Sequence, residues 1–204
     1  ICTYGFLAKN DLKKANIELN EEIIKILNPL SEDYTIMRTS TIPSMMQALA
    51  FNNSKKNKDV QLFDISKTYK NKNQAIENVE IPNEETILTI GIYGKNADFY
   101  ILKGIVENVL ELSGVSRYDI RREEKNPTFH PGKTANVNIG TDIIATLGEI
   151  HPIVLENYDI SQKVVIAEIN IDKIVKYAKN TKKYVELPKF PAVTRDIAII
   201  VDED

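Results

Sequence analysis

The sequence has little cysteine, no long apolar run and almost no excess of either charge, and each shortage excludes a class of protein. One cysteine, Cys2, among 204 residues excludes an internal disulfide and suits a reducing cytoplasm, where we expect the protein to be. No run approaches the roughly 20 apolar residues of a membrane-spanning helix, and the opening "ICTYGF" resembles a strand of an excised piece rather than a signal peptide. Lys and Arg number 26 against 29 Asp and Glu, so a net charge of -3 gives no overall basic field for nucleic acid.

Motifs for nucleotide or metal chemistry are missing as well. The sequence contains no G-x-x-x-x-G-K-[ST], no G-x-G-x-x-G and no H-E-x-x-H. His130 and His151 each precede a proline, which favours a place in a turn or at a strand end, and one cysteine with two histidines predicts no metal site. Neighbouring carboxylates in Glu21–Glu22 and Glu123–Glu124 do not face one site, so we interpret them as solvated surface.

What the sequence does contain is an alternation of helix and strand patterns with 43% apolar residues, enough for a sizeable core. Helices are expected at 20–28, after Asn20 as a cap; at 41–52, with Pro43 in the first turn; and from Asp98 to Gly114. Strands are expected at 59–69, 86–94, 135–140, 142–150 and 164–171, and a polar loop at 70–85.

The last stretch, "LPKFPAVTRDIAIIVDED", predicts a strand that lacks neighbours. Ile197 to Val201 form an unbroken apolar run typical of a buried strand, but only three residues follow it. A new sheet that starts here indicates the beginning of a further domain.

Four blocks of the sequence resemble the beta chain of bacterial phenylalanyl-tRNA synthetase, in the same order and at similar spacing. They are "NPLSEDYTIMRTSTIPSMMQALAFNNSKKNKDVQLFDISKTY", "FHPGKTANV", "LGEIHP" and the closing "LPKFPAVTRDIAIIVDED". The resemblance implies an α+β fold like a class II aminoacyl-tRNA synthetase core, a mainly antiparallel sheet flanked by helices. It implies a catalytic-like domain at 1–184 and the start of a truncated ferredoxin-like anticodon-binding domain at 185–204.

The second motif of catalytic class II cores has the type FEIGxxFRxE, where the arginine holds the activated carboxylate and the α-phosphate. Here the matching stretch is "FDISKTYKNK", which puts Lys70 at the arginine and Lys72 at the acidic residue. Lysine keeps the charge but lacks the planar two-pronged donor of arginine, and the second change reverses a charge.

The third motif, GxGxER, resembles "VVIAEINIDKI" still less. Glu168 and Asn170 take the glycine positions and Lys173 takes the arginine position. Side chains there keep the backbone away from a nucleotide, and Glu168 would direct a carboxylate at a triphosphate. The plain alternative is an alternating strand with Glu168 on its wet face; both interpretations predict no catalysis.

The resemblance therefore implies a non-catalytic structural core of the beta subunit, which supports assembly with a catalytic alpha subunit in a heterotetramer of two alpha and two beta chains. That complex charges tRNA(Phe) with phenylalanine; we expect ATP and Mg²⁺ in the complex, no cofactor or metal in this segment, contact with tRNA only through the complex, and no membrane contact. Two alternatives stay open: a free-standing class II paralogue with ligase activity, and a free-standing tRNA-binding module, which the negative net charge disfavours.

If the chain functions in assembly, apolar residues of the predicted helix at 41–52 are candidates for the interface with a partner. We name Ile42, Met45, Met46 and Phe51 as interface candidates, the first three on the apolar stripe of the helix and Phe51 outside its centre. The alternative for Phe51 is that it folds back under a loop.

Overall fold

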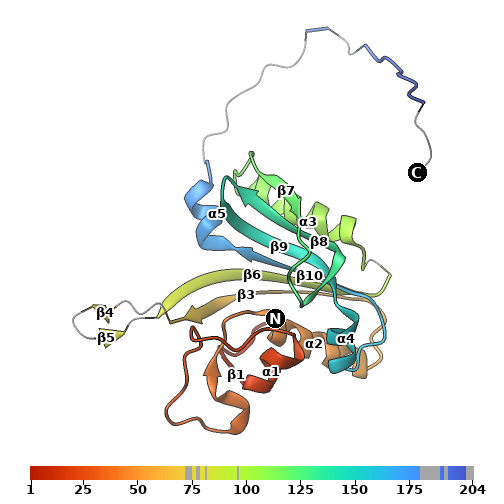
Figure 1. Ribbon diagram of the computed structural model, residues 1–204. Coiled ribbons are helices and arrows are strands. Elements are labelled where there is room, and N and C mark those ends of the chain that lie inside the picture. The colour runs from red at the N-terminus through yellow and green to blue at the C-terminus, as the bar shows by residue number, and fades with distance from the viewer. Residues whose placement is uncertain are drawn as a thin grey trace.

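The computed structural model describes residues 1–71, 75–76, 79–80, 82–95, 97–179, 189–190 and 193–200. Its centre is a six-stranded antiparallel sheet with the strand order β3-β6-β10-β9-β8-β7 (Figure 1). The strands of this sheet are β3 (Val60–Lys70), β6 (Asn83–Tyr93), β7 (Asp119–Arg122), β8 (Phe129–Ile139), β9 (Asp142–Ile150) and β10 (Val164–Asn170). The other strands of the described residues form two short pairs, β1 (Phe6–Leu7) with β2 (Ile36–Met37) and β4 (Ala75–Ile76) with β5 (Val79–Glu80).

Helices cover both faces of the sheet. They are α1 (Lys9–Lys14), the 3-10 helix η1 (Glu32–Tyr34), α2 (Ile42–Ser54), α3 (Phe99–Leu112), α4 (Pro152–Asn157) and α5 (Ile171–Tyr177). One apolar core joins α3 and α5 to one face, and a second joins α2 and α4 to the other (Figure 1). This arrangement confirms the predicted α+β architecture. No helix in the described part of the chain has the length and apolar character that crossing a bilayer requires.

Strand β10 lies between β6 and β9 and is buried on both faces. Val165, Ala167 and Ile169 belong to the core under α3 and α5, whereas Val164 and Ile166 belong to the core under α2. Because side chains alternate between the two faces of a strand, the run "VVIAEIN" had to be apolar at nearly every position. Of its two polar residues, Glu168 and Asn170, the first lies on the face that carries α2.

Two predicted helices are confirmed at their expected ends. The Asp98 side chain accepts a hydrogen bond from the Tyr100 N–H at 2.8 Å and so caps α3. Gly114 follows the same helix with φ +80°, a conformation that favours glycine. In α2, Pro43 stands in the first turn, as expected.

The predicted helix at 20–28 is wrong. Asn20 does accept a bond from the Glu22 N–H, at 3.1 Å, but the chain then continues in an extended form. Lys25 forms a β-bridge with Ile36, and the Ile26 N–H donates to the Thr35 carbonyl at 3.0 Å. Pairing with a distant segment supplies the backbone hydrogen bonds here, and it overrides the local cap signal.

Two other segments, 70–85 and the C-terminal stretch, differ from their predictions, and part of the second lies outside the described residues. The stretch 70–85 is not a plain loop, because it contains β4, β5 and the start of β6 at Asn83. Residues 193–200 form no strand and are drawn away from the sheet (Figure 1), with Ile197 and Ile200 83% and 97% exposed. Val201 and the predicted boundary between 184 and 185 lie outside the described residues, so the start of a second domain stays a prediction.

Candidate functional site

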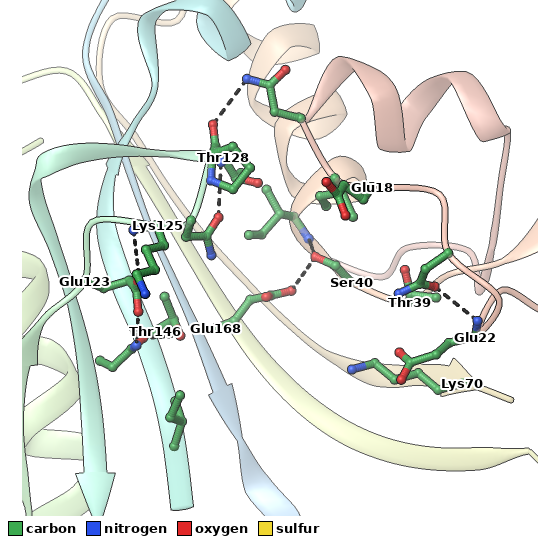
Figure 2. A pocket seen from close by; sticks show the side chains of 18 residues that line it. Glu18, Glu22, Thr39, Ser40, Lys70, Glu123, Lys125, Thr128, Thr146 and Glu168 are labelled. Carbon is green, nitrogen blue, oxygen red and sulfur yellow. Dashed lines mark hydrogen bonds between the residues drawn. The ribbon is translucent and has the colours of Figure 1, made fainter. Parts of the chain in front are cut away.

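A cleft of about 700 Å³ opens on the face of the sheet that carries α2. Its walls are the segment 16–22 after α1, the segment 39–42 before α2 and the segment 123–128 after β7, and its floor is formed by side chains of β3, β8, β9 and β10 (Figure 2). A smaller hollow of about 220 Å³ continues it and shares Lys70, Thr146 and Glu168. Strands from the two halves of the chain thus contribute to one concave surface, the usual geometry of a ligand site.

The cleft gathers the residues that the degenerate motifs singled out. Lys70 and Glu168 line both hollows, and Asn170 and Lys173 line the smaller one. Lys72 lies outside the described residues. The four motif positions that the structure describes thus line two adjoining hollows, and their assignment as a degenerate nucleotide site stays a prediction.

Glu168 is held by the segment that leads into α2. Its Oε1 accepts a hydrogen bond from the Ser40 hydroxyl at 2.8 Å (Figure 2). It also accepts hydrogen bonds from the Thr41 N–H at 2.8 Å and the Thr41 hydroxyl at 2.7 Å. The interpretation of Glu168 as a purely solvated side chain is therefore incomplete, because one carboxylate oxygen is bound within the chain. Ser40 and Thr41 were not identified from the sequence, which predicted only that a helix begins at 41.

Asn170 and Lys173 act on the chain itself in this structure. The Asn170 side chain accepts a hydrogen bond from the Lys173 N–H at 2.9 Å and caps α5. The Lys173 ammonium donates to the Ile143 carbonyl at 2.8 Å. The half-buried side chain of Lys70, in contrast, makes no hydrogen bond or ion pair with any described residue and lies at the floor of the cleft.

The charges around the larger hollow are mostly negative. Lys70 and Lys125 face four carboxylates, which are Glu18, Glu22, Glu123 and Glu168. Phosphate groups would meet more repulsion than attraction on such a lining. The described residues also hold no cluster of three or more His, Cys, Asp or Glu side chains suited to a metal ion.

Glu22 and Glu123, which we interpreted as solvated surface, both line the cleft. Glu123 accepts a hydrogen bond from the Asn136 amide at 2.7 Å, and the Thr146 hydroxyl donates to the same Asn136 at 2.7 Å. Glu124 is exposed and pairs with Arg122, as expected of a surface residue. The pattern of two adjacent carboxylates carried no signal for this difference, which depends on the pairing of β7, β8 and β9.

Both histidines have local structural roles. The His151 ring accepts a hydrogen bond from the Ile153 N–H at 3.2 Å at the start of α4, directly after β9. The His130 ring accepts one from the Gly132 N–H at 3.1 Å near the start of β8. This agrees with the prediction of turn and strand-end positions.

The prediction of an interface role is wrong for three of the four candidates, because their side chains are buried. Ile42, Met45 and Met46 are 3%, 1% and 0% exposed and form the core between α2 and the sheet, so they present no side chain to a partner. The stripe that suggested them is the face that α2 turns to its own sheet. Phe51 is 63% exposed, with the Lys55 ammonium 5.4 Å from its ring centroid, so the alternative that it folds back under a loop is wrong.

Solved structures with the same fold define the class of protein. Two structures of pyrrolysyl-tRNA synthetase from Desulfitobacterium hafniense, one of them named PylSc, align with TM-scores of 0.67 and 0.68 over 86% of this chain. The aligned part makes up 60% and 61% of the two solved chains, and the sequence identity is 17% in both. The fold is that of a class II aminoacyl-tRNA synthetase core.

The particular family follows from sequence matches. The family model of the phenylalanyl tRNA synthetase beta chain CLM domain matches residues 1–171. The phenylalanine–tRNA ligase beta subunits of Clostridium acetobutylicum and Clostridium tetani are 45% and 44% identical over 98% and 99% of this chain. The chain belongs to the phenylalanyl-tRNA synthetase beta chain CLM domain family. It spans about a quarter of the length of these two relatives.

Proposed function

We propose that this chain is the non-catalytic structural core of a cytoplasmic phenylalanyl-tRNA synthetase beta subunit. In this proposal it supports assembly with a catalytic alpha subunit into a heterotetramer that charges tRNA(Phe) with phenylalanine at the expense of ATP. The names of its relatives, phenylalanine–tRNA ligase beta subunits, support the complex to which it is assigned. The single observation that carries the non-catalytic role is the Glu168 carboxylate bound to Ser40 and Thr41 in the cleft.

Three features of the cleft argue against nucleotide chemistry in this domain. The Glu168 side chain stands where catalytic cores have a glycine, Lys70 offers a single ammonium in place of a guanidinium fork, and Lys173 donates to a backbone carbonyl of its own sheet. We therefore assign ATP and Mg²⁺ to the alpha subunit. In our proposal, tRNA binding also belongs to the complex rather than to this chain alone.

We expect the isolated chain to show no phenylalanine-dependent exchange of ATP with pyrophosphate. Loss of one preorganised charge-stabilising contact costs about 10²–10³ in rate, and three are missing here, so exchange should stay at the level of a blank. The assembled synthetase serves as the positive control. Exchange that depends on phenylalanine and disappears in Lys70→Ala would overturn the non-catalytic assignment and favour the paralogue with ligase activity.

Phe51 offers a surface for the assembly role. Its neighbours on α2 are tied to the chain, since the Asn52 amide donates to the Ala48 carbonyl at 2.9 Å and the Asn53 amide donates to the Asp159 carbonyl at 3.3 Å. Phe51 directly precedes these anchored residues in α2, so its exposed ring starts from a fixed backbone position. A rigidly placed aromatic side chain is a typical anchor of protein interfaces, so we propose that Phe51 contacts the alpha subunit.

Phe51→Asp is expected to weaken capture of the alpha subunit at least roughly fivefold, which corresponds to about 1 kcal/mol of binding free energy. Co-expression of the two chains followed by affinity capture measures it, with circular dichroism to show that the variant is folded. Tyr100→Asp is the matched control, because Tyr100 is 77% exposed on α3 and lies on the other side of the sheet. Equal capture by both variants would remove Phe51 from the interface, and no capture by the unchanged chain would place the assembly contacts elsewhere in the beta subunit.

A further inference from the structure

The segment before α2 presents three hydrogen-bond donors to one point in the cleft. They are the Ser40 hydroxyl, the Thr41 N–H and the Thr41 hydroxyl, all within 2.8 Å of Glu168 Oε1. The remaining bonds of these groups fix the direction of each proton. The Ser40 hydroxyl accepts from the Ile42 N–H at 3.1 Å, and the Thr41 hydroxyl is in contact with the Thr89 hydroxyl, which can donate to it. The Ser40 and Thr41 hydroxyl protons are therefore directed at the carboxylate.

The position of these donors favours the binding of a negatively charged group. Thr41 is the N-cap of α2, a helix of 13 residues, and the partial positive charge of a helix N-terminus attracts anions. Thr41 and Thr89 are 1% and 0% exposed, so the donors sit on a rigid, buried base rather than on a mobile surface. Hydrogen bonds to an ionised acceptor are shorter and stronger than neutral ones, and the three bonds to Oε1 measure 2.7 or 2.8 Å.

The acceptor comes from the floor of the cleft. Glu168 stands on β10 between Thr89 of β6 and Thr146 of β9, and 127 residues separate it from Thr41. Its carboxylate links the sheet to the start of α2 and lines both hollows of the cleft. The chain thus supplies its own anion to a set of donors that would otherwise face the cleft.

We propose that Ser40 and Thr41 form an oxyanion site that the chain occupies with its own Glu168 carboxylate, which excludes small carboxylates from the cleft. The side chain acts as an internal ligand, so the site becomes available to an external carboxylate only when Glu168 is removed. Glu168→Ala deletes the Cγ atom together with the carboxyl group, which are the heavy atoms of acetate. Acetate is therefore the matching probe.

Thermal unfolding of the purified chain tests the proposal. In sodium acetate, Glu168→Ala should melt about 2–4 °C higher than in sodium chloride of the same ionic strength, because a ligand that binds only the folded state stabilises it. The unchanged chain should show no such difference, since its site is filled. Glu18→Ala is the matched control: it removes an exposed carboxylate from the same cleft, one that makes no hydrogen bond or ion pair with the described residues. A missing acetate effect in Glu168→Ala, or an equal effect in all three proteins, would overturn the proposal.

A second measurement does not require the alanine variant to fold. In the unchanged chain the Thr41 N–H precedes the first helical residue, and its acceptor among the described residues is Glu168. Hydrogen exchange of this amide should be as slow as that of the β10 amides and at least tenfold faster in Glu168→Gln, which keeps the size of the side chain but not its charge. Fast exchange in the unchanged chain would show that the carboxylate does not occupy the donors, and the same rate in both proteins would overturn the preference of the site for an anion, because the glutamine carbonyl oxygen can still accept the bond.

Discussion

Arg38→Ala is expected to lower the free energy of unfolding by about 3–5 kcal/mol, the cost of removing one partner from a buried charged pair. Arg38 is 2% exposed and Asp64 4%. The guanidinium Nε donates to the Lys67 carbonyl at 2.7 Å, and Nη1 donates to the Thr3 hydroxyl at 2.7 Å. Alanine would leave Asp64 buried without its cation and these acceptors without a donor.

Arg38 is linked to Asp64 mainly through hydrogen bonds of the Thr3 hydroxyl. The direct distance from Nη1 to the Asp64 carboxylate is 3.9 Å, and the Thr3 hydroxyl, which accepts from Arg38, donates to the same carboxylate. Burial lowers the pKa of Arg38, and the charge of Asp64 acts in the opposite direction. Because the Arg38 guanidinium is paired with Asp64 and hydrogen-bonded on several sides, it anchors the N-terminal segment to β3.

Chemical denaturation of three variants measures this effect. Arg121→Ala is the matched control, because Arg121 is 60% exposed in its ion pair with Asp119 and such surface pairs contribute about 0–1 kcal/mol. Arg38→Lys should fall between the two, since it keeps a cation but loses the planar set of donors. An Arg38→Ala protein as stable as Arg121→Ala would mean that the buried network contributes nothing.

Gly94→Ala is expected to cost about 2–5 kcal/mol for two independent reasons that add. Gly94 ends β6 with φ +100°, which side-chain-bearing residues rarely adopt. A Cβ atom there would also lie 2.5 Å from the Lys58 carbonyl oxygen, which is backbone and cannot turn away, and 2.4 Å from the Asp59 carboxylate. That carboxylate accepts the Lys95 N–H at 2.6 Å, so moving it would break a second contact.

The same substitution at Gly104 should have the opposite sign. Gly104 lies within α3, and a Cβ atom added there meets nothing within 4 Å. Alanine in a helix interior is favoured over glycine by roughly 0.5–1 kcal/mol, so Gly104→Ala should raise the melting temperature while Gly94→Ala lowers it. An unchanged or higher melting temperature of Gly94→Ala would show that the turn at Gly94 is less constrained than its contacts indicate, and a lower one of Gly104→Ala would contradict the open surroundings of Gly104.

The sequence by itself determined the elements whose signals are local. The apolar alternation of β10, the cap at Asp98 and the glycine at Gly114 each act within a few residues, and each correctly predicted a strand or a helix end. The motif comparison likewise placed Lys70 and Glu168 in one site, because a family pattern already contains the fold. These predictions needed no knowledge of distant contacts.

Only the tertiary structure decided the rest. The segment after Asn20 is extended because its partner is Ile36, and Met45 is core because α2 turns it toward the sheet. The bond between Glu168 and Thr41 exists because strand register brings together residues that are 127 positions apart. A hydrogen bond at such separation depends on the positions of whole strands and helices, and no local pattern at either end specifies it.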